Sequence, residues 1–490
     1  MSESNRPVVV IGAGLAGIAV ALRLRKKGRN VTVLERNESF GGKLSDFEWE
    51  GYRFDKGPSL FTMPEQVDEL FELYGKDPRE HFHYVKINES CHYYFPDGTD
   101  FLLEGDKVRR NKALVDTFGS EYGQAAINYI EEIGKTYDEI GTIFIDRSKF
   151  GVKNIFDSAL IKRYPKLVSR KVTGSLNSFN QRKLKDDNLV QLFNRYGTYN
   201  GSDPYRMSGL YSMIPHLEVN LGTFFPKNGM RSIVERLYDL AIDNGVDFRF
   251  NQKTITASPV NGGYQVKTND DTIEAVELVS AIDCVTFYDS VLKDSKLSEK
   301  YKKQERSSSA VVFYWAVEKI IPELKLHNIF FGADYEEEFA QIFNTKVLPD
   351  KPTVYVHVSS VVNPEDAPVN GQNWFVMINT PAGIVPDDVQ REQLRQYIGN
   401  MMQKHLGCSV LESVKHEKFW DASKIEMDTG SYMGALYGAA CNDTMAAFTR
   451  HGNVSKKYKN LYFCGGTVHP GGGIPLVLKS AKIVSELMPS

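Results

Sequence analysis

An unbroken run of β-branched residues near the start of the chain, Val8 to Ile11, predicts a parallel strand that is covered on both faces. Apolar residues at helical spacing follow as far as Lys27, and Gly28 supplies the stop signal of a helix. Residues 31–35 (VTVLE) then predict the next strand. The pattern indicates a strand–helix–strand unit with a right-handed crossover.

Further along, the hydrophobic pattern switches between helical and strand periods. Helical spacing predicts helices over 64–75, 232–245 and 389–405. Strand-rich sequence runs from about 306 to 380, and its longest apolar run, 310–317, predicts a buried strand. Asn261-Gly262-Gly263 predicts a hairpin turn, and residues 459–487 again predict strand, glycine turn and helix. We find no internal repeat and no low-complexity linker, so we expect interleaved domains.

The totals exclude several classes of protein. A chain of 490 residues predicts two or three domains, and a net charge of -3 gives no support for a nucleic-acid binder. The five cysteines are scattered and lack any C-x-x-C spacing, which argues against a disulfide framework or a metal site and favours a reducing compartment. There is no signal-peptide pattern and no apolar run near the roughly 18 residues of a membrane span. We expect a cytoplasmic protein, free or resting on a membrane.

One stretch of the middle region is strongly basic. Between Arg147 and Lys171 there are eight lysines or arginines and a single acid, Asp157. Helical spacing would place Val152, Ile155, Phe156 and Leu160 on one side with cations flanking them. This pattern is typical of a helix lying in a membrane interface, and a solvated basic helix over a core explains it equally well.

A glycine motif follows the first predicted strand. Gly12, Gly14 and Gly17 satisfy G-x-G-x-x-G, in which the first glycine makes the tight turn and the second lets the backbone approach a pyrophosphate. The third allows close packing of helix and strand, and the helix N-terminus stabilises negative charge. Glu35 ends the next strand, where its carboxylate can accept hydrogen bonds from a ribose diol. We conclude that the chain binds a dinucleotide.

The fingerprint alone does not separate nicotinamide from flavin, and two further features favour FAD. Gly41, Gly42 and Lys43, and then Gly57, Pro58 and Ser59, offer backbone and a cation beyond the ribose acid. At the other end of the chain, Gly465, Gly466 and Thr467 precede a helix that opens near Ile474 with Pro475 in its first turn. That helix N-terminus would favour the negative charge of a reduced flavin, whereas the alternative is a plain C-terminal strand–helix unit.

These stretches, with YRFDKGPSLFTMP, FPKNGM (225–230), SAIDC (280–284) and the segment NLYFCGGTVHPGGGIPLVLKSAK, resemble the phytoene-desaturase-type carotenoid oxidoreductases of the FAD-dependent amine-oxidase-like superfamily. The resemblance runs from residue 8 to 482. It implies a non-covalent FAD, membrane association without a span, and removal of two hydrogens from a long isoprenoid. GGKLS and FDKGPSLFTMP most resemble bacterial desaturases that act at the 3,4 position of 1-hydroxylated or γ-carotene-type carotenoids.

The resemblance also assigns the cofactor site. Ten positions match the family pattern directly: Gly12, Gly14, Gly17, Glu35, Gly42, Lys43, Gly57, Pro58, Gly466 and Pro475. With them we expect Leu15, Ala16, Arg36, Gly41, Ser59, Thr254, Gly465, Thr467, Gly473 and Ile474 to bind FAD. Thr254 stands where the family commonly has a valine whose backbone meets the adenine. One extra residue before His469 distinguishes this chain from the family's GTHPGAG.

The resemblance implies hydride transfer from an allylic carbon to flavin N5, followed by loss of a proton from the neighbouring carbon. A polyene-stabilised cation makes that proton acidic, so a weak base suffices and we assign no catalytic residue. Glu218 and His469 are expected to be structural or solvent-facing. The substrate domain should provide a long apolar tunnel, with 196–217 and 310–317 as candidate lining. The electron acceptor is not identified.

We expect an α/β fold in which a Rossmann-like FAD-binding domain is interleaved with a β-sheet-rich substrate domain and a helical membrane-facing insertion. The expected segments are 1–75, 219–290 and 426–490 for FAD, 76–140 and 291–425 for substrate, and 141–218 for the insertion. Four alternatives stay open: a phytoene- or lycopene-type desaturase, a polyene saturase, a non-redox prenyl-binding carrier and an amine oxidase. The intact glycines argue against the carrier, and the HPGGGIP segment fits an amine oxidase poorly.

Overall fold

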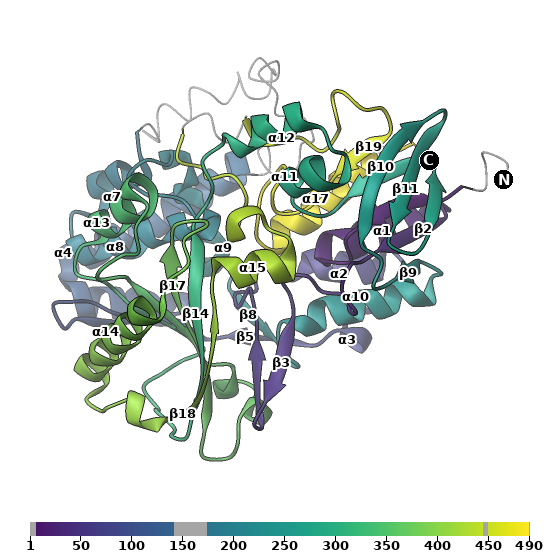
Figure 1. The fold of residues 1–490 in the computed structure, drawn as a ribbon. Helices are drawn as coiled ribbons and strands as arrows, with labels where there is room; N and C mark the ends of the chain where they lie inside the picture. The colour runs from purple at the N-terminus through teal and green to yellow at the C-terminus, as the bar shows by residue number, and fades with distance from the viewer. Residues whose placement is uncertain (1–5, 142–173, 444–448, 490) are drawn as a thin grey trace.

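The computed structural model describes residues 6–141, 174–443 and 449–489 (Figure 1). The basic stretch between Arg147 and Lys171, for which the sequence leaves a membrane-interface helix and a solvated basic helix open, lies outside the described residues. Within the described ranges, no helix combines the length and the apolar character that crossing a membrane requires.

The first half of the molecule is built on a five-stranded parallel sheet. Its order is β19 (Leu461–Phe463), β13 (Glu277–Ser280), β1 (Val8–Ile11), β2 (Val31–Leu34) and β9 (Asp247–Arg249). The predicted strand–helix–strand unit is confirmed, with α1 (Leu15–Lys26) between β1 and β2. Gly28 follows α1 with a φ of 80°, the left-handed conformation that ends a helix. Every residue of β1 is buried, as its β-branched run predicts.

The two faces of this sheet are covered differently. Val8 and Val10 pack among α1, α2 (Glu65–Glu72), α10 (Arg231–Asp243) and α17 (Ile474–Leu487). Val9 and Ile11 point the other way, toward the three-stranded antiparallel sheet of β10 (Thr254–Val260), β11 (Gly263–Thr268) and β12 (Thr272–Ala275). The alternation of side chains along β1 therefore joins two separate apolar clusters. Short helices α11 (Cys284–Thr286) and α12 (Ser295–Lys302) lie on this second side (Figure 1).

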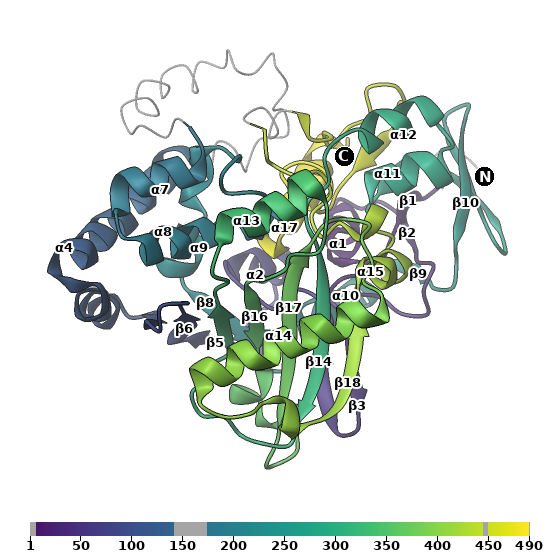
Figure 2. The same cartoon turned by 60° about the vertical axis from the view of Figure 1, so that its left-hand side comes forward.

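The second half is built on a seven-stranded sheet. Its order is β18 (Val414–Trp420), β14 (Ser309–Val317), β17 (Gln372–Thr380), β16 (Val354–His357), β15 (His327–Phe330), β6 (Glu89–Tyr94) and β7 (Asp100–Glu104). All pairs are antiparallel except β15 and β6. The predicted buried strand at 310–317 is β14, and all of its residues are buried. Figure 2 shows α14 (Asp388–Leu406) lying across one face, where Ile398 and Met402 belong to the same buried apolar cluster as Trp315.

The opposite face of this sheet meets the hairpin β3 (Asp46–Trp49) and β4 (Tyr52–Asp55) and a helical layer. The helical layer contains α4 (Lys107–Thr136), α7 (Leu176–Leu184), α8 (Asp187–Asn194), η4 (Arg195–Asn200), η5 (Gly209–Met213), α9 (Pro215–Val219) and α13 (Tyr335–Ala340). Strands β5 (Tyr84–Ile87) and β8 (Thr223–Pro226) form a short ladder, and α3 (Pro78–His81) and α15 (Ala422–Thr429) complete the main elements. Residues 174–218 of the expected insertion form α7, α8, η4, η5 and α9, and nothing in these described residues supports the expected membrane-facing role.

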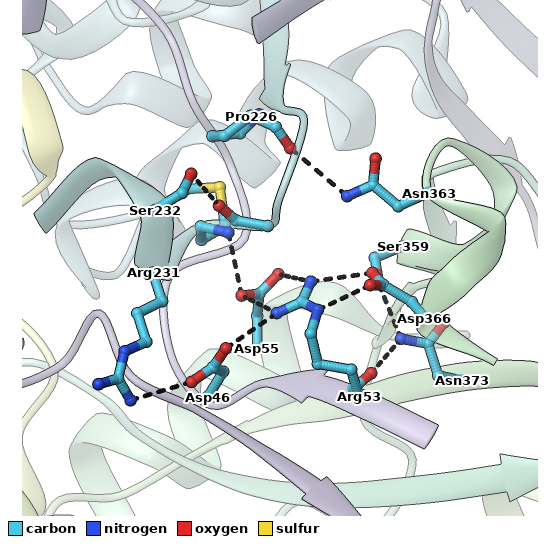
Figure 3. Close-up of polar contacts among 12 residues, drawn as sticks. Asp46, Arg53, Asp55, Pro226, Arg231, Ser232, Ser359, Asn363, Asp366 and Asn373 are labelled. Atoms are coloured by element: carbon cyan, nitrogen blue, oxygen red, sulfur yellow. Dashed lines mark hydrogen bonds and ion pairs between the residues drawn. The ribbon is translucent and has the colours of Figure 1, made fainter. Parts of the chain in front are cut away.

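A buried ion-pair network centred on Arg53 of β4 joins the two halves (Figure 3). The Arg53 guanidinium donates to Asp366 at 2.7 and 2.8 Å and to Asp55 at 3.0 Å. Asp55 Oδ1 also accepts the backbone N–H of Met230, which precedes α10, at 3.0 Å. One guanidinium thus holds β4, the start of α10 and the segment after β16 together, just before the chain reaches Gly57.

Candidate active site

A cavity of about 870 Å³ extends between the two halves, at the upper end of the range typical of small-molecule sites. All of the predicted cofactor residues except Gly17 line it. They reach it from segments that are far apart in the sequence: the turn after β1, the end of β2, residues 41–43 and 57–59, the start of β10, and residues 465–475. The fold therefore brings these residues to one place.

The glycine turn after β1 has the geometry that its motif predicts. Gly12 has a φ of 105°, which favours glycine. A Cβ on Gly17 would lie 1.9 Å from the carbonyl oxygen of Gly12, so α1 can pack this closely only because position 17 lacks a side chain. A Cβ on Gly14 would meet nothing nearer than the Gly41 carbonyl at 3.9 Å. Gly17 is therefore a packing residue, and Gly14 leaves open space before the N-terminus of α1.

Glu35 is a buried carboxylate at the end of β2, with 8% of its surface exposed. Its Oε2 accepts the N–H of Ala13 at 2.8 Å, and its Oε1 accepts that of Asn37 at 3.0 Å. These bonds fix the carboxylate beside the glycine turn. Arg36, the next residue, donates to the carbonyl oxygen of Met427 in α15, which is far away in the sequence.

Lys43 contributes a cation to the cavity. Its side chain is partly exposed to the cavity, and its Nζ donates to the carbonyl oxygen of Leu436 at 2.6 Å. Desolvation lowers the pKa of Lys43 to about 8, an effect that the carboxylate of Asp283 partly offsets. A Cβ on Gly57 would lie 2.1 Å from the Lys43 carbonyl, so the two motif segments cross at a point that only glycine allows. Because the pKa of Lys43 is about 8, its amine can change charge near neutral pH.

The C-terminal motif closes the same cavity. Gly465 and Gly473 have φ values of 116° and 101°, and α17 begins directly after Gly473 without a side-chain cap. Helix α17 packs beside α1 (Figure 1), and the N-terminal residues of both helices line the cavity. Because a helix N-terminus carries partial positive charge, the two ends together favour an anionic ligand.

Several residues around this end could not be identified from the sequence. Arg450 lines the cavity and donates to the Tyr437 and Gly466 carbonyls at 3.0 and 3.2 Å, which fixes the glycine turn. No motif surrounds Arg450, whereas Asp283 lies within the SAIDC stretch. The buried atoms Asp283 Oδ2 and Thr254 Oγ1 make no hydrogen bond with any described residue, although both residues line the cavity. A dinucleotide would hydrogen-bond to these polar atoms and would occupy the space that the glycines leave open.

The other part of the cavity is mainly apolar. Leu210, Tyr211, Met213, Ile214 and Leu217 line it from the helical layer, and Ala310, Val312, Ile329, Phe375 and Met377 from the seven-stranded sheet. Both stretches that sequence analysis named as candidate lining, 196–217 and 310–317, contribute to the wall. Such a surface suits a hydrocarbon, which is held by buried area.

Two polar clusters interrupt this wall. Arg195 and Glu218 form an ion pair at 3.2 Å, and Tyr199 Oη donates to the same carboxylate. Glu218 is only 1% exposed, so the expectation of a structural role fits and a solvent-facing one is wrong. Separately, Tyr355 Oη lies 2.7 Å from both Ser59 Oγ and His327 Nδ1. His469, for which sequence analysis left the same two roles open, is buried and lines the cavity.

Comparison with known proteins places this site in a family. The model of the flavin containing amine oxidoreductases matches residues 15–488. The chain is 42% identical over 99% of both chains to a 1-hydroxycarotenoid 3,4-desaturase from Flavobacterium sp. (strain P99-3), and 28% identical, over 99% of this chain and 90% of the other, to a phytoene desaturase from Fusarium fujikuroi. A redesigned triple mutant of putrescine oxidase shares the fold, with a TM-score of 0.66 at 15% identity over 98% of each chain. The chain belongs to the flavin-containing amine oxidoreductases and, within them, groups with the carotenoid desaturases.

Proposed function

We propose that this protein is an FAD-dependent desaturase that introduces a C=C bond at the 3,4 position of a 1-hydroxycarotenoid or a γ-carotene-type substrate. The observation that carries the proposal is a single cavity in which a dinucleotide cradle continues into an apolar wall. The full-length similarity to a 1-hydroxycarotenoid 3,4-desaturase supports the choice of substrate and bond.

The residues around the cradle fit FAD. We propose that the open space at Gly14, the carboxylate of Glu35, the amine of Lys43 and the N-termini of α1 and α17 hold it, together with the other predicted residues. When bound, FAD supplies a two-electron acceptor for hydride. The glycines keep the backbone N–H groups accessible, and the helix ends stabilise negative charge at the phosphates and the flavin.

The substrate part of the cavity acts by positioning and by excluding water. Its apolar side chains surround a hydrocarbon and align it without hydrogen bonds. We assign no catalytic base. Glu218 is paired with Arg195, and Lys43 donates to Leu436, so neither of these two groups is free to accept the proton. A proton next to a polyene-stabilised cation needs only a weak acceptor.

The experiment that tests the function is a visible spectrum of dispersed carotenoids, 1-hydroxylated and non-hydroxylated, before and after incubation with the protein, FAD and an oxidant. Desaturation lengthens the conjugated system, so we expect a red shift with the hydroxylated substrate. A blue shift would identify a saturase instead. No shift with any carotenoid would contradict the proposal and favour a prenyl-binding carrier or an amine oxidase.

We propose that residues 1–75, 219–290 and 426–490 form the FAD-binding domain and that 76–140 and 291–425 form the substrate domain, with 141–218 as a helical insertion. The strands of the parallel sheet all come from the first three segments, and those of the seven-stranded sheet all come from the next two, which supports this division.

We further propose that the protein rests on a membrane surface, from which a lipid-soluble substrate could enter. The support is the sequence between Arg147 and Lys171, where basic residues flank apolar ones. Replacing Lys162, Arg163 and Lys166 by glutamate should weaken sedimentation with anionic liposomes, because each basic residue near such a surface contributes about 1 kcal/mol. The exposed lysines Lys296, Lys300 and Lys303, changed likewise, provide a charge-matched control. Equal loss in both triple variants would contradict a specific docking face.

The pKa of Lys43 predicts a pH dependence of FAD binding. Anionic pyrophosphate should raise this pKa above its value of about 8 in the free protein, so binding above pH 8 takes up a proton. FAD affinity is therefore expected to be constant below about pH 7.5 and to fall about tenfold by pH 9. Fluorescence titration of FAD into the apoprotein measures it. The Lys43→Met variant should bind FAD more weakly at pH 7, and its FAD affinity should no longer fall between pH 7.5 and 9. An unchanged fall in the variant would assign the pH dependence to another group.

A further inference from the structure

The apolar part of the cavity contains a series of three hydrogen-bonded side chains, and the proposed reaction gives no role to two of them, Tyr355 and His327. Ser59 Oγ, Tyr355 Oη and His327 Nδ1 are linked at 2.7 Å each, and all three residues line the cavity. This hydrogen-bonded series begins at Ser59, beside Pro58 in the proposed FAD site, and ends at His327 on β15 of the seven-stranded sheet. It therefore spans from the cofactor side of the cavity to the substrate side.

At the substrate end of this hydrogen-bonded series, His327 has a ring nitrogen without a hydrogen-bond partner among the described residues. His327 is 2% exposed, and its Nε2 has no hydrogen-bond partner among the described residues. Burial, with the nearby His357 and Arg195, lowers the pKa of His327 well below its usual value, so the imidazole is neutral. A neutral imidazole presents either a donor or an acceptor at Nε2, depending on the hydrogen of Tyr355, and a hydroxyl group can match either. A ligand hydroxyl would therefore satisfy an otherwise unpaired buried atom.

The neighbouring polar cluster is less suited to such a ligand. Both oxygens of Glu218 accept hydrogen bonds from Arg195, and Tyr199 donates to the same carboxylate. The guanidinium, whose Nε lacks a partner within the described residues, lies over the rings of Tyr93, Tyr196 and Tyr199 at 5.2, 4.4 and 5.2 Å. This cluster is largely satisfied within itself and enclosed by aromatic rings.

We propose that His327, oriented by Tyr355 and Ser59, binds the hydroxyl group of the carotenoid end and gives the enzyme its preference for hydroxylated substrates. The inference rests on the proposed function. In a 1-hydroxycarotenoid, C2 alone separates the hydroxyl-bearing C1 from C3, so a group that binds this hydroxyl must lie near the reacting bond. The hydrogen-bonded series starts at the cofactor segment, so it lies near the place where the reacting bond must be. A site that hydrogen-bonds a hydroxyl group discriminates against the analogue that lacks the hydroxyl.

The structure offers a matched pair of histidines for the test. His327 and His357 face each other across β15 and β16, both are buried, and Nε2 of each lacks a partner among the described residues. His327 lines the cavity, whereas His357 is absent from its lining. The two rings stack at 5.2 Å on the same face of the sheet, so His327→Phe and His357→Phe make the same substitution at neighbouring positions, one in the cavity lining and one just outside it.

The test uses a 1-hydroxylated carotenoid and its non-hydroxylated parent as substrates for the wild type and both variants. We measure kcat/KM for each carotenoid, and we obtain its dissociation constant from the quenching of flavin fluorescence. His327→Phe is expected to lower the preference for the hydroxylated substrate at least about tenfold in both quantities, whereas His357→Phe leaves the preference within about twofold. Equal losses on both substrates, an unchanged preference, or the same selective loss in His357→Phe would overturn the assignment.

Two controls keep the result interpretable. If the wild type converts neither carotenoid, the proposed function fails; if it converts both equally well, only the hydroxyl-binding inference fails. FAD content reports folding, and if His327→Phe does not fold, Tyr355→Phe decides: it removes one oxygen that orients His327 and is expected to lower the preference about threefold to tenfold. An unchanged preference in a folded Tyr355→Phe protein would then overturn the proposal.

Discussion

Replacing Gly17 by alanine is expected to yield a protein that no longer retains FAD. The new Cβ would lie 1.9 Å from the Gly12 carbonyl oxygen, which is backbone and has no rotamer to escape into. Either α1 moves away from the turn or the turn changes shape, and in both cases the N–H groups before α1 no longer converge on the phosphates. We expect the affinity for FAD to fall more than about 100-fold, since an overpacked site of this kind costs about 1–3 kcal/mol or more before any lost contact is counted.

The measurement is the ratio of flavin to protein absorbance after purification, followed by a fluorescence titration of FAD. Gly28→Ala is the matched control, because Gly28 ends the same helix and a Cβ there meets nothing within 4 Å. Its φ of 80° makes alanine cost about 1–2 kcal/mol of stability, without any effect on the turn at Gly12. A Gly17→Ala protein that retains stoichiometric FAD would show that the proposed cradle is misplaced.

The nucleotide half could be predicted from the sequence because its signals are local. Val8 to Glu35 carry a strand, a turn, a helix and a second strand within one contiguous stretch, and the structure reproduces each of them. The distinction between Gly14 and Gly17 also follows from spacing alone, and both have the environments that the motif implies. Helices α2, α10 and α14 follow their apolar periodicity in the same way.

The substrate half could be predicted only in outline. A hydrophobic run predicts that β14 is buried, but it does not say which strands will flank it or which of its side chains will meet a cavity. His327 and Tyr355 lie on the paired strands β15 and β16, and Ser59 meets them from the irregular segment after β4. No spacing rule links such residues, because tertiary packing alone sets their distance. Arg450 escaped for the same reason, since its partners are main-chain carbonyls. Glu218 was expected to be structural, but nothing in the sequence pointed to its distant partner Arg195.

Arg53→Leu is expected to cause a large loss of stability. Removing the guanidinium leaves Asp55 and Asp366, which are 3% and 5% exposed, without their cation, and breaking a buried pair in this way typically costs about 3–5 kcal/mol. The same change removes the side-chain bonds between β4 and Asp366 that Figure 3 draws, and so is expected to loosen the approach to Gly57 and Ser59. Urea unfolding, followed by circular dichroism and by flavin fluorescence, measures both effects.

The pH dependence of this loss separates a buried-charge effect from a simple packing effect. Desolvation already raises the pKa of Asp55 in the presence of Arg53, and without the cation the folded-state pKa of Asp55 rises further. The folded variant then binds more protons than the unfolded chain, so its stability should recover as the pH falls from 8 toward 5. Arg249→Leu is the control, because its partner Asp247 is exposed and such a pair contributes about 0–1 kcal/mol. A loss in Arg53→Leu that is the same at both pH values would instead indicate that Arg53 acts through its packing.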